Sequence, residues 1–146
     1  MQQRVSVLTI GVDHLPAIRA FYAEKIGWRP IAENKDILFI QMNGFLLSFT
    51  QRKPLADFIG ISSEGTGFRS FTIGYNVDTK EEVTDWYHKL KEQGITILKE
   101  PEEASFGGHF FYFSDIEGNI LEIAYNPYIE LDNVGNVLGH ASIDHL

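Results

Sequence analysis

An α+β fold made of two tandem β-α-β-β-β modules is predicted by an internal repeat in this sequence. Each half places one helical segment after a β-branched strand and before a hairpin, and short segments recur in the same order in both halves. Two matches share an offset of 65 residues and a third has an offset of 74. The matches are Val12-Asp13 with Val77-Asp78, Phe21-Tyr22 with Trp86-Tyr87, and Gly44 with Gly118.

The composition is that of one folded domain. A chain of 146 residues that is 44% hydrophobic and 13% aromatic can bury a single core. Cysteine is absent, which fits a reducing compartment and leads us to expect a cytoplasmic protein. No apolar run approaches the ~20 residues that a membrane span requires, so no membrane association is expected.

The formal net charge of −8 is concentrated in the last third of the chain. Residues 101–146 contain eight Asp and Glu and neither Lys nor Arg, whereas residues 1–100 are balanced. An acidic chain is repelled by phosphate backbones, so we expect no nucleic-acid partner.

The first module is predicted over about residues 4–50. Residues 5–12 are β-branched and apolar and predict a strand. A helix follows, with Asp13 as its expected N-cap, Pro16 in its first turn and Gly27 at its end. Strands are predicted at 36–41 and 45–50, on either side of the hairpin turn Asn43-Gly44.

The second module is predicted over about residues 68–127. A strand at 69–77 precedes a capping box of Thr79 and Glu82, and the helix that this box starts is expected to end at Gly94. A short strand at 95–99 and a hairpin of 109–113 with 120–125 complete the module.

One domain, residues 1–127, is therefore expected to contain both modules. Residues 51–67 are rich in Gly, Ser and Pro and are predicted to be a flexible linker. Residues 128–146 have little periodicity and are predicted to form an irregular C-terminal tail.

Strand alternation assigns two rows of side chains to each strand. The more apolar rows are expected to pack under the helices: Leu8, Ile10 and Val12 in one half, and Phe71, Ile73, Tyr75 and Val77 in the other. The opposite rows are expected to line a concave cup formed by the curved mixed sheets.

Two motifs carry a family resemblance: Gly11-Val-Asp-His-Leu15 before Phe21-Tyr22, and the stretch from Gly107 to Pro127 with its turn Asp115-Ile-Glu-Gly-Asn119. With these motifs the chain resembles the vicinal oxygen chelate superfamily, which includes glyoxalase I, bleomycin-resistance proteins and extradiol dioxygenases. The family turn usually has proline where Ile116 stands. The resemblance covers about residues 4–127 and implies the paired-module fold. It also implies a homodimer, for which open sheet edges offer a physical reason.

In metal-using members of this family, four positions in the cup supply the metal ligands. The resemblance places these positions at Val7, Ser48, Thr72 and Glu122. Only Glu122 is a plausible ligand, and a transition metal requires several His or carboxylate ligands. We therefore expect no cofactor, with a divalent metal at a rebuilt site as the alternative.

Several residues are candidates for binding or catalysis. Glu122 suits a general base, or is a structural carboxylate held by hydrogen bonds, to which Ser48 and Thr72 can contribute. His109, after two glycines, is either an acid, base or ligand contact or an exposed residue at a loop edge. Further candidate ligand contacts are the aromatic residues Trp28 and Phe111, and Arg52 and Arg69, which can either bind a carboxylate or remain solvated.

The predicted function is that of a glyoxalase-like protein that binds a small, partly aromatic or apolar molecule in the cup. It would sequester this molecule or isomerise it with Glu122 as base, without the usual metal quartet. The alternatives are a metal-dependent lyase or dioxygenase with a rearranged site and a non-catalytic dimeric interaction module. Whether the protein is an enzyme stays open at this point.

Overall fold

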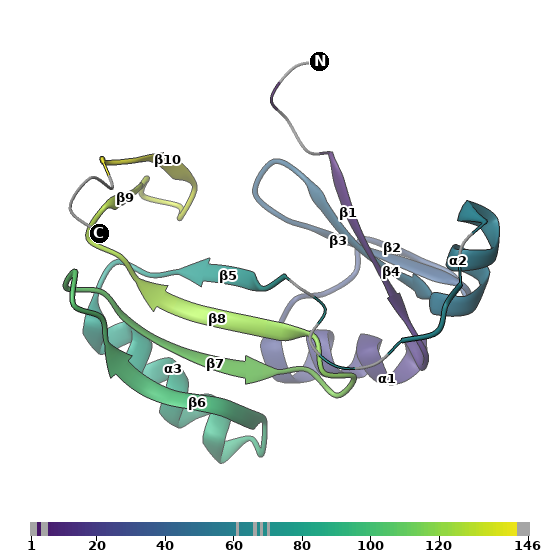
Figure 1. Cartoon of the computed structure of the whole chain (residues 1–146), viewed down its shortest axis with the longest axis horizontal. Helices are drawn as coiled ribbons and strands as arrows, with labels where there is room; N and C mark the ends of the chain where they lie inside the picture. The colour runs from purple at the N-terminus through teal and green to yellow at the C-terminus, as the bar shows by residue number, and fades with distance from the viewer. Residues whose placement is uncertain are drawn as a thin grey trace. The chain divides into compact units, whose positions relative to one another are not determined.

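The computed structural model describes residues 3, 6–60, 62–65, 67, 69 and 71–142. Val5 and Ser70, which belong to predicted strands, lie outside these residues. The chain divides into two compact units, residues 1–69 and residues 70–146, each described below by itself (Figure 1). No helix in the described part of the chain is long and apolar enough to cross a membrane.

The first unit contains a four-stranded mixed sheet with the order β1-β4-β3-β2. β1 runs parallel to β4, and the other neighbouring strands are antiparallel. In chain order, its elements are β1 (Val7–Val12), α1 (Leu15–Ala20), the π-helix η1 (Phe21–Ile26), β2 (Ala32–Glu33), β3 (Ile37–Gln41), β4 (Leu46–Gln51) and α2 (Arg52–Ile59).

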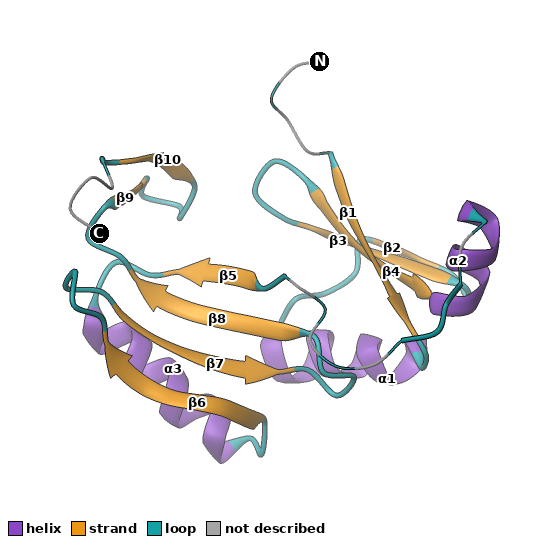
Figure 2. Ribbon diagram, in the orientation of Figure 1, coloured by secondary structure: helices purple, strands orange, loops and turns teal. Residues whose placement is uncertain are grey.

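The second unit repeats this sheet with the order β5-β8-β7-β6 and adds a separate two-stranded sheet of β9 and β10 (Figure 2). β5 runs parallel to β8, as β1 does to β4. In chain order, its elements are β5 (Ile73–Asn76), α3 (Lys80–Glu92), β6 (Thr96–Glu103), β7 (His109–Ser114), β8 (Ile120–Tyr125), β9 (Ile129–Leu131) and β10 (Val137–His140).

The strand registers agree with the internal repeat. Thr9 lies opposite Ser48 in the first sheet, and Gly74 lies opposite Glu122 in the second. Thr9 and Gly74 are 65 residues apart, and Ser48 and Glu122 are 74 apart, which are the two offsets found in the sequence. The predicted paired-module fold is thus confirmed at the level of topology and register.

The first helix begins one residue later than predicted. His14, not Asp13, is the N-cap, and its Nδ1 accepts a hydrogen bond from the backbone N–H of Ala17. Pro16 lies in the first turn as expected. The helix continues as η1 and ends at Gly27, whose φ of 88° is the left-handed conformation that glycine adopts without strain.

α3 begins as the sequence predicts. The hydroxyl of Thr79 accepts from the backbone N–H of Glu82, and the Glu82 carboxylate accepts from the backbone N–H of Thr79. This reciprocal pair satisfies two of the N–H groups that a helix start leaves without partners. Val83, Tyr87 and Leu90 then form the buried stripe of α3.

Two segments are more regular than predicted. Residues 52–59, assigned to a flexible linker, form α2, because Lys53 and Asp57 pair one turn apart and Gly60 ends the helix with a φ of 85°. Residues 129–131 and 137–140, assigned to an irregular tail, pair as the β9–β10 hairpin. Both segments are too short to show a clear hydrophobic period, so the sequence pattern did not predict their secondary structure.

The core of the first unit lies between α1, η1 and the sheet face that carries Ile10 and Phe49, and the core of the second lies between α3 and one face of its sheet. In the second unit, α3 packs against β6, β7 and β8, over Phe111, Phe113, Leu121 and Ile123. Because β5 is the edge strand beyond this contact, Phe71 and Tyr75 are 37% and 42% exposed, although both were expected in the packed row. In the first unit, Ile10 and Val12 are buried as expected, whereas Leu8 is 38% exposed.

Candidate functional site

The face of the second sheet that points away from α3 carries Glu122. Phe111 on β7 contacts Tyr87 of α3 with ring centroids 5.7 Å apart, which places the odd-numbered side chains of β7 on the helix side. Strand alternation then places Tyr112 and its partner Glu122 on the other side. We call this surface the Glu122 face; its residues are Gly74 and Asn76 of β5, Phe110, Tyr112 and Ser114 of β7, and Ile120, Glu122 and Ala124 of β8.

The Glu122 carboxylate has open space beside it, above the edge strand. Gly74 is its register partner on β5, and a Cβ added to Gly74 would lie 3.9 Å from Glu122 Oε2. Among the described residues, no other atom lies within 4 Å of that added Cβ, apart from atoms of the adjoining residues. The side chain that glycine lacks would therefore occupy a volume directly next to the carboxylate.

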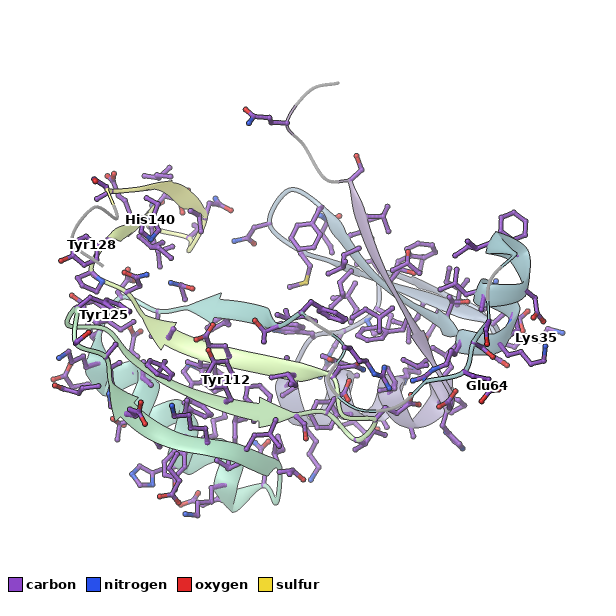
Figure 3. The ribbon with its side chains drawn as sticks, viewed as in Figure 1. Lys35, Glu64, Tyr112, Tyr125, Tyr128 and His140 are labelled. Carbon is purple, nitrogen blue, oxygen red and sulfur yellow. The ribbon has the colours of Figure 1, made fainter. Side chains whose placement is uncertain are left out.

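Tyr112 lies directly opposite Glu122 on the neighbouring strand β7 (Tyr112 is labelled in Figure 3). Burial, the hydrogen bond to Glu122 and the negative charge of Glu122 together raise the pKa of Tyr112 to about 12. The phenol is protonated at neutral pH, and its O–H can donate a hydrogen bond to the Glu122 carboxylate. This arrangement orients the carboxylate and leaves the tyrosine ring as part of the face.

A second aromatic ring extends the surface along β7. Phe110 and Tyr112 meet edge to face, with ring centroids 5.7 Å apart. The ammonium group of Lys99 lies 5.1 Å from the Phe110 ring centroid and 3.0 Å from Glu102 Oε1. The Glu122 face thus combines two rings with carboxylates, an arrangement that suits a ligand with an aromatic or positively charged part.

His109 does not join Glu122. Its Nε2 lies 3.4 Å from Thr84 Oγ1 on α3, so the imidazole is on the helix side of the sheet. His109 Nδ1 is buried and has no hydrogen-bond partner among the described residues. Glu103 lies opposite His109 on β6, and its bond to Lys80 is the main cause of its lowered pKa. A joint acid–base role of His109 with Glu122 is therefore incompatible with the strand geometry.

Phe111 belongs to the core of the second unit. Its side chain is fully buried and lies between the rings of Tyr87 and Phe113. The prediction that Phe111 contacts a ligand is not supported by this position, because parity turns it toward α3. Thr72 is exposed and immediately precedes β5, two residues before Gly74.

Two of the four positions at which the resemblance predicts metal ligands lie in the first unit. Val7 opens β1 and is 43% exposed. Ser48 on β4 is fully buried, and its hydroxyl has no hydrogen-bond partner among the described residues. Burying an unpaired hydroxyl costs about 1–3 kcal/mol, so serine is an energetically unfavourable residue at this buried position of β4.

The aromatic and basic candidates have structural neighbours of their own. Trp28 is half-buried and stacks on Tyr22, with ring centroids 5.9 Å apart. Arg52 opens α2, and its Nε lies 3.4 Å from Asp13 Oδ1, while its Nη2 is buried without a hydrogen-bond partner among the described residues. Arg69 is half-buried.

The residues at the four family positions do not fit a transition-metal site. They offer the carboxylate of Glu122, the hydroxyls of Ser48 and Thr72, and the isopropyl group of Val7. Zinc and similar ions bind in proteins through several His, Cys or carboxylate donors at once. Within the described residues, no three His, Asp or Glu side chains gather closely enough to hold a metal ion.

Sequence reasoning missed Tyr112, Phe110 and Gly74 as neighbours of Glu122. The signal was present in the turn Asp115–Asn119, which closes on the opposed pair Ser114 and Ile120. Counting outward from that pair aligns Tyr112 with Glu122. The relation of Gly74 to Glu122 follows from the two repeat offsets only once Thr9 is known to pair with Ser48.

Comparisons with known proteins agree with this architecture. The model of the Glyoxalase/Bleomycin resistance protein/Dioxygenase superfamily matches residues 4–123. Metallothiol transferase FosB from Staphylococcus haemolyticus is 25% identical over 125 residues, which are 84% of each chain.

Solved structures extend the likeness to the fold. A glyoxalase-related enzyme from Fulvimarina pelagi superimposes with a TM-score of 0.85 and 33% identity, covering 96% of this chain and 100% of the other. Lactoylglutathione lyase from Agrobacterium tumefaciens shares the fold at 16% identity, with a TM-score of 0.68 and coverage of 86% and 95%. Because the family match extends over most of both units, the chain belongs to the Glyoxalase/Bleomycin resistance protein/Dioxygenase superfamily.

Proposed function

We propose that this protein binds a small, partly aromatic molecule on the Glu122 face. The observation that carries the proposal is the half-buried carboxylate of Glu122, which is oriented by Tyr112 and bordered by the space above Gly74. Binding sites commonly combine apolar or aromatic walls with a few oriented polar groups. Phe110 and Tyr112 supply the rings, and Glu122 supplies the polar anchor.

Proton transfer is a second candidate for the same residues. Glu122 would take a proton from one carbon of the ligand and return it to another, an isomerisation that needs no further reactant. The observation that favours it is Tyr112, which keeps its proton because its pKa is raised to about 12 and can orient the carboxylate. Binding without reaction requires only the ring and carboxylate contacts, so it is the first proposal.

A metal-dependent activity is the competing hypothesis. The FosB relative is described as a metallothiol transferase, and transfer of that kind would require this chain to hold a metal. The single carboxylate among the four family positions argues against such a site here. Elemental analysis tests this hypothesis on protein that is purified with neither chelators nor metal ions in the buffers. Stoichiometric Ni, Zn, Fe or Mn would support the metal-dependent lyase, dioxygenase or transferase.

The binding proposal is tested by thermal shift with a library of small aromatic molecules, because a ligand that binds the native state raises Tm. The decisive variant is Gly74→Leu, whose side chain would fill the space beside Glu122. Gly139→Leu on β10 is the matched control, since a Cβ there meets no atom of the described part of the chain within 4 Å. We expect to find ligands that raise the Tm of the parent and of Gly139→Leu but not the Tm of Gly74→Leu. Ligands that stabilise all three equally, or none that stabilises the parent, would refute the proposal.

We also propose that the protein is a cytoplasmic homodimer. The absence of cysteine supports a reducing compartment. β1 and β5 are open edges of their sheets, and Phe58 at the end of α2 is 92% exposed. Such edges and apolar side chains favour association with a second copy. Light scattering that returns the mass of one chain at micromolar concentration would contradict the dimer.

A further inference from the structure

The two units differ strongly in charge. Residues 1–69 contain eight Lys and Arg and six Asp and Glu, a formal net charge of +2. Residues 70–146 contain four Lys and fourteen Asp and Glu, a formal net charge of −10. A field of one sign over a binding surface raises the local concentration of ligands of the opposite sign. The unit that carries Glu122 therefore attracts cations.

The four lysines of the second unit are all engaged with its own side chains. Lys80, Lys91 and Lys99 lie 2.9, 3.2 and 3.0 Å from the carboxylates of Glu103, Glu100 and Glu102. Lys89 lies over the ring of Trp86, 4.3 Å from the centroid. Among the described residues, no Lys or Arg forms an ion pair with Glu122.

Lys99 shows how this face holds an ammonium group. Its Nζ is shared between the Glu102 carboxylate and the face of the Phe110 ring, a carboxylate and an aromatic ring on adjacent strands. Glu122 and Tyr112 form the same combination on the next pair of strands, next to the Phe110 ring. No lysine or arginine pairs with this second carboxylate among the described residues, and the space above Gly74 is on the side of Glu122 away from Tyr112.

We propose that the ligand of the Glu122 face is an organic cation, a primary or quaternary ammonium group attached to a small apolar or aromatic body. The proposal rests on the binding function proposed above. The ammonium group pairs with the Glu122 carboxylate in the space above Gly74, and the apolar body extends across Glu122 toward the ring of Tyr112. A carboxylate or phosphate ligand would meet Glu122 and the negative charge of the whole unit, and the Lys99 ammonium on this face is already paired with Glu102.

Calorimetric titration with a matched set of probes tests the charge requirement. The probes are benzyltrimethylammonium and benzylamine as cations, benzyl alcohol as the neutral analogue and benzoate as the anion. We expect both cations to bind the parent protein more tightly than benzyl alcohol, and benzoate to bind most weakly. The preference should decrease between low and high salt, because screening shortens the range of the field. Equal affinity for benzylamine and benzyl alcohol would overturn the proposal.

Point variants test whether Glu122 is the residue responsible for the preference for cations. Glu122→Gln keeps the shape and should weaken benzyltrimethylammonium binding by about tenfold or more, as loss of a charged partner does. Glu130→Gln, an exposed residue of β9, removes the same charge from the same unit and should change the affinity by less than about threefold. Tyr112→Phe provides an independent variant that keeps the ring and the charge, and it should retain the preference for cations. Equal losses in Glu122→Gln and Glu130→Gln would refute the assignment.

The two proposals fail in different ways. If neutral or anionic aromatic molecules stabilise the parent but not Gly74→Leu, and the cations stabilise neither protein, then the binding function stands and the cation proposal is wrong. If no probe or library member distinguishes the parent from Gly74→Leu, then the binding function itself is wrong.

Discussion

Tyr112 and Glu122 are directly opposed across the antiparallel pair β7–β8, and the tyrosine hydroxyl is hydrogen-bonded to the carboxylate. Burial, this bond and the carboxylate charge raise the pKa of Tyr112 to about 12. The pair is the polar centre of a face that otherwise offers rings and small side chains. It links strand register to the chemistry of the candidate site.

Absorbance titration of the tyrosines tests this pair. The protein has six tyrosines, and one of them should ionise near pH 12. In Glu122→Gln, where the charge is absent, that tyrosine should titrate closer to the ordinary value of 10. Tyr112→Phe should remove the late transition, and Tyr125→Phe should keep it.

The same pair predicts how stability depends on pH. A group whose pKa is higher in the folded state than in the unfolded state stabilises the fold fully below the unfolded value. For Tyr112 this contribution is therefore present below pH 10 and is lost as the pH rises toward 12. Denaturant titrations give the free energy of unfolding at pH 9 and at pH 11.5. The decrease between the two pH values should be smaller for Tyr112→Phe than for the parent.

The turn Asp115–Asn119 should be a major determinant of stability. Asp115 is 4% exposed, and its carboxylate accepts hydrogen bonds from the backbone N–H groups of Glu117 and Asn119 and from Asn119 Nδ2. Asp115→Ala leaves these donors without that acceptor and should lower the free energy of unfolding by about 3 kcal/mol. Urea denaturation measures this value; a change below about 1 kcal/mol would contradict the prediction.

The β9–β10 hairpin uses the same turn and should respond to acid. Asp132 accepts from the backbone N–H groups of Val134 and Asn136 and from Asn136 Nδ2, in the pattern of Asp115. These bonds lower the pKa of Asp132 from 3.8, so its stabilising contribution is present above that value and is lost as the pH falls below it. NMR amide signals of residues 129–140 should broaden or shift below pH 3.8, and Asp132→Ala should show the change already at pH 7.

Gly11 is predicted to be required for the packing of α2 on β1. A Cβ at Gly11 would lie 3.1 Å from the Cα of Arg52 and 3.4 Å from a methyl group of Leu55. The backbone of Arg52 cannot yield as a flexible side chain can, so Gly11→Val should destabilise the protein by about 1–3 kcal/mol. Gly139→Val, in open space, serves as the control in the same thermal denaturation series. Equal stability of the two variants would show that α2 packs differently.

The capping box of α3 offers a prediction on helix stability. Thr79→Ala removes the acceptor for the Glu82 backbone N–H and should cost about 1 kcal/mol in chemical denaturation. Glu81→Ala, at the next exposed position of the first turn, should cost less, since no hydrogen bond in the box involves it. A larger loss for Glu81→Ala than for Thr79→Ala would argue against the box as the cause.

Much of the fold follows from local signals in the sequence. The strand β8 has the predicted bounds, and the capping box and the turn at Asn43-Gly44 occur where expected. The repeat offsets of 65 and 74 residues agree with the observed registers of Thr9 with Ser48 and of Gly74 with Glu122. α2 and the β9–β10 hairpin were missed because short elements leave too few positions for a period to appear.

The candidate site was less accessible to prediction. Glu122 and His109 were both candidates from the sequence, which did not relate their strand rows, and the structure places their side chains on opposite faces of the sheet. Tyr112, its actual neighbour, was overlooked because the turn that sets its register was not used to count across the hairpin.

The sequence by itself determined the repeated module, the turns and the position of a lone carboxylate, since backbone propensities, caps and strand alternation act within a few residues. The tertiary structure decided which face of the second sheet α3 covers, and thereby that Phe111 and His109 lie against the helix while Tyr112 and Glu122 lie on the other face. Coverage of a face depends on the packing of elements that are distant in the chain, and no local pattern encodes which side chain will have a neighbour.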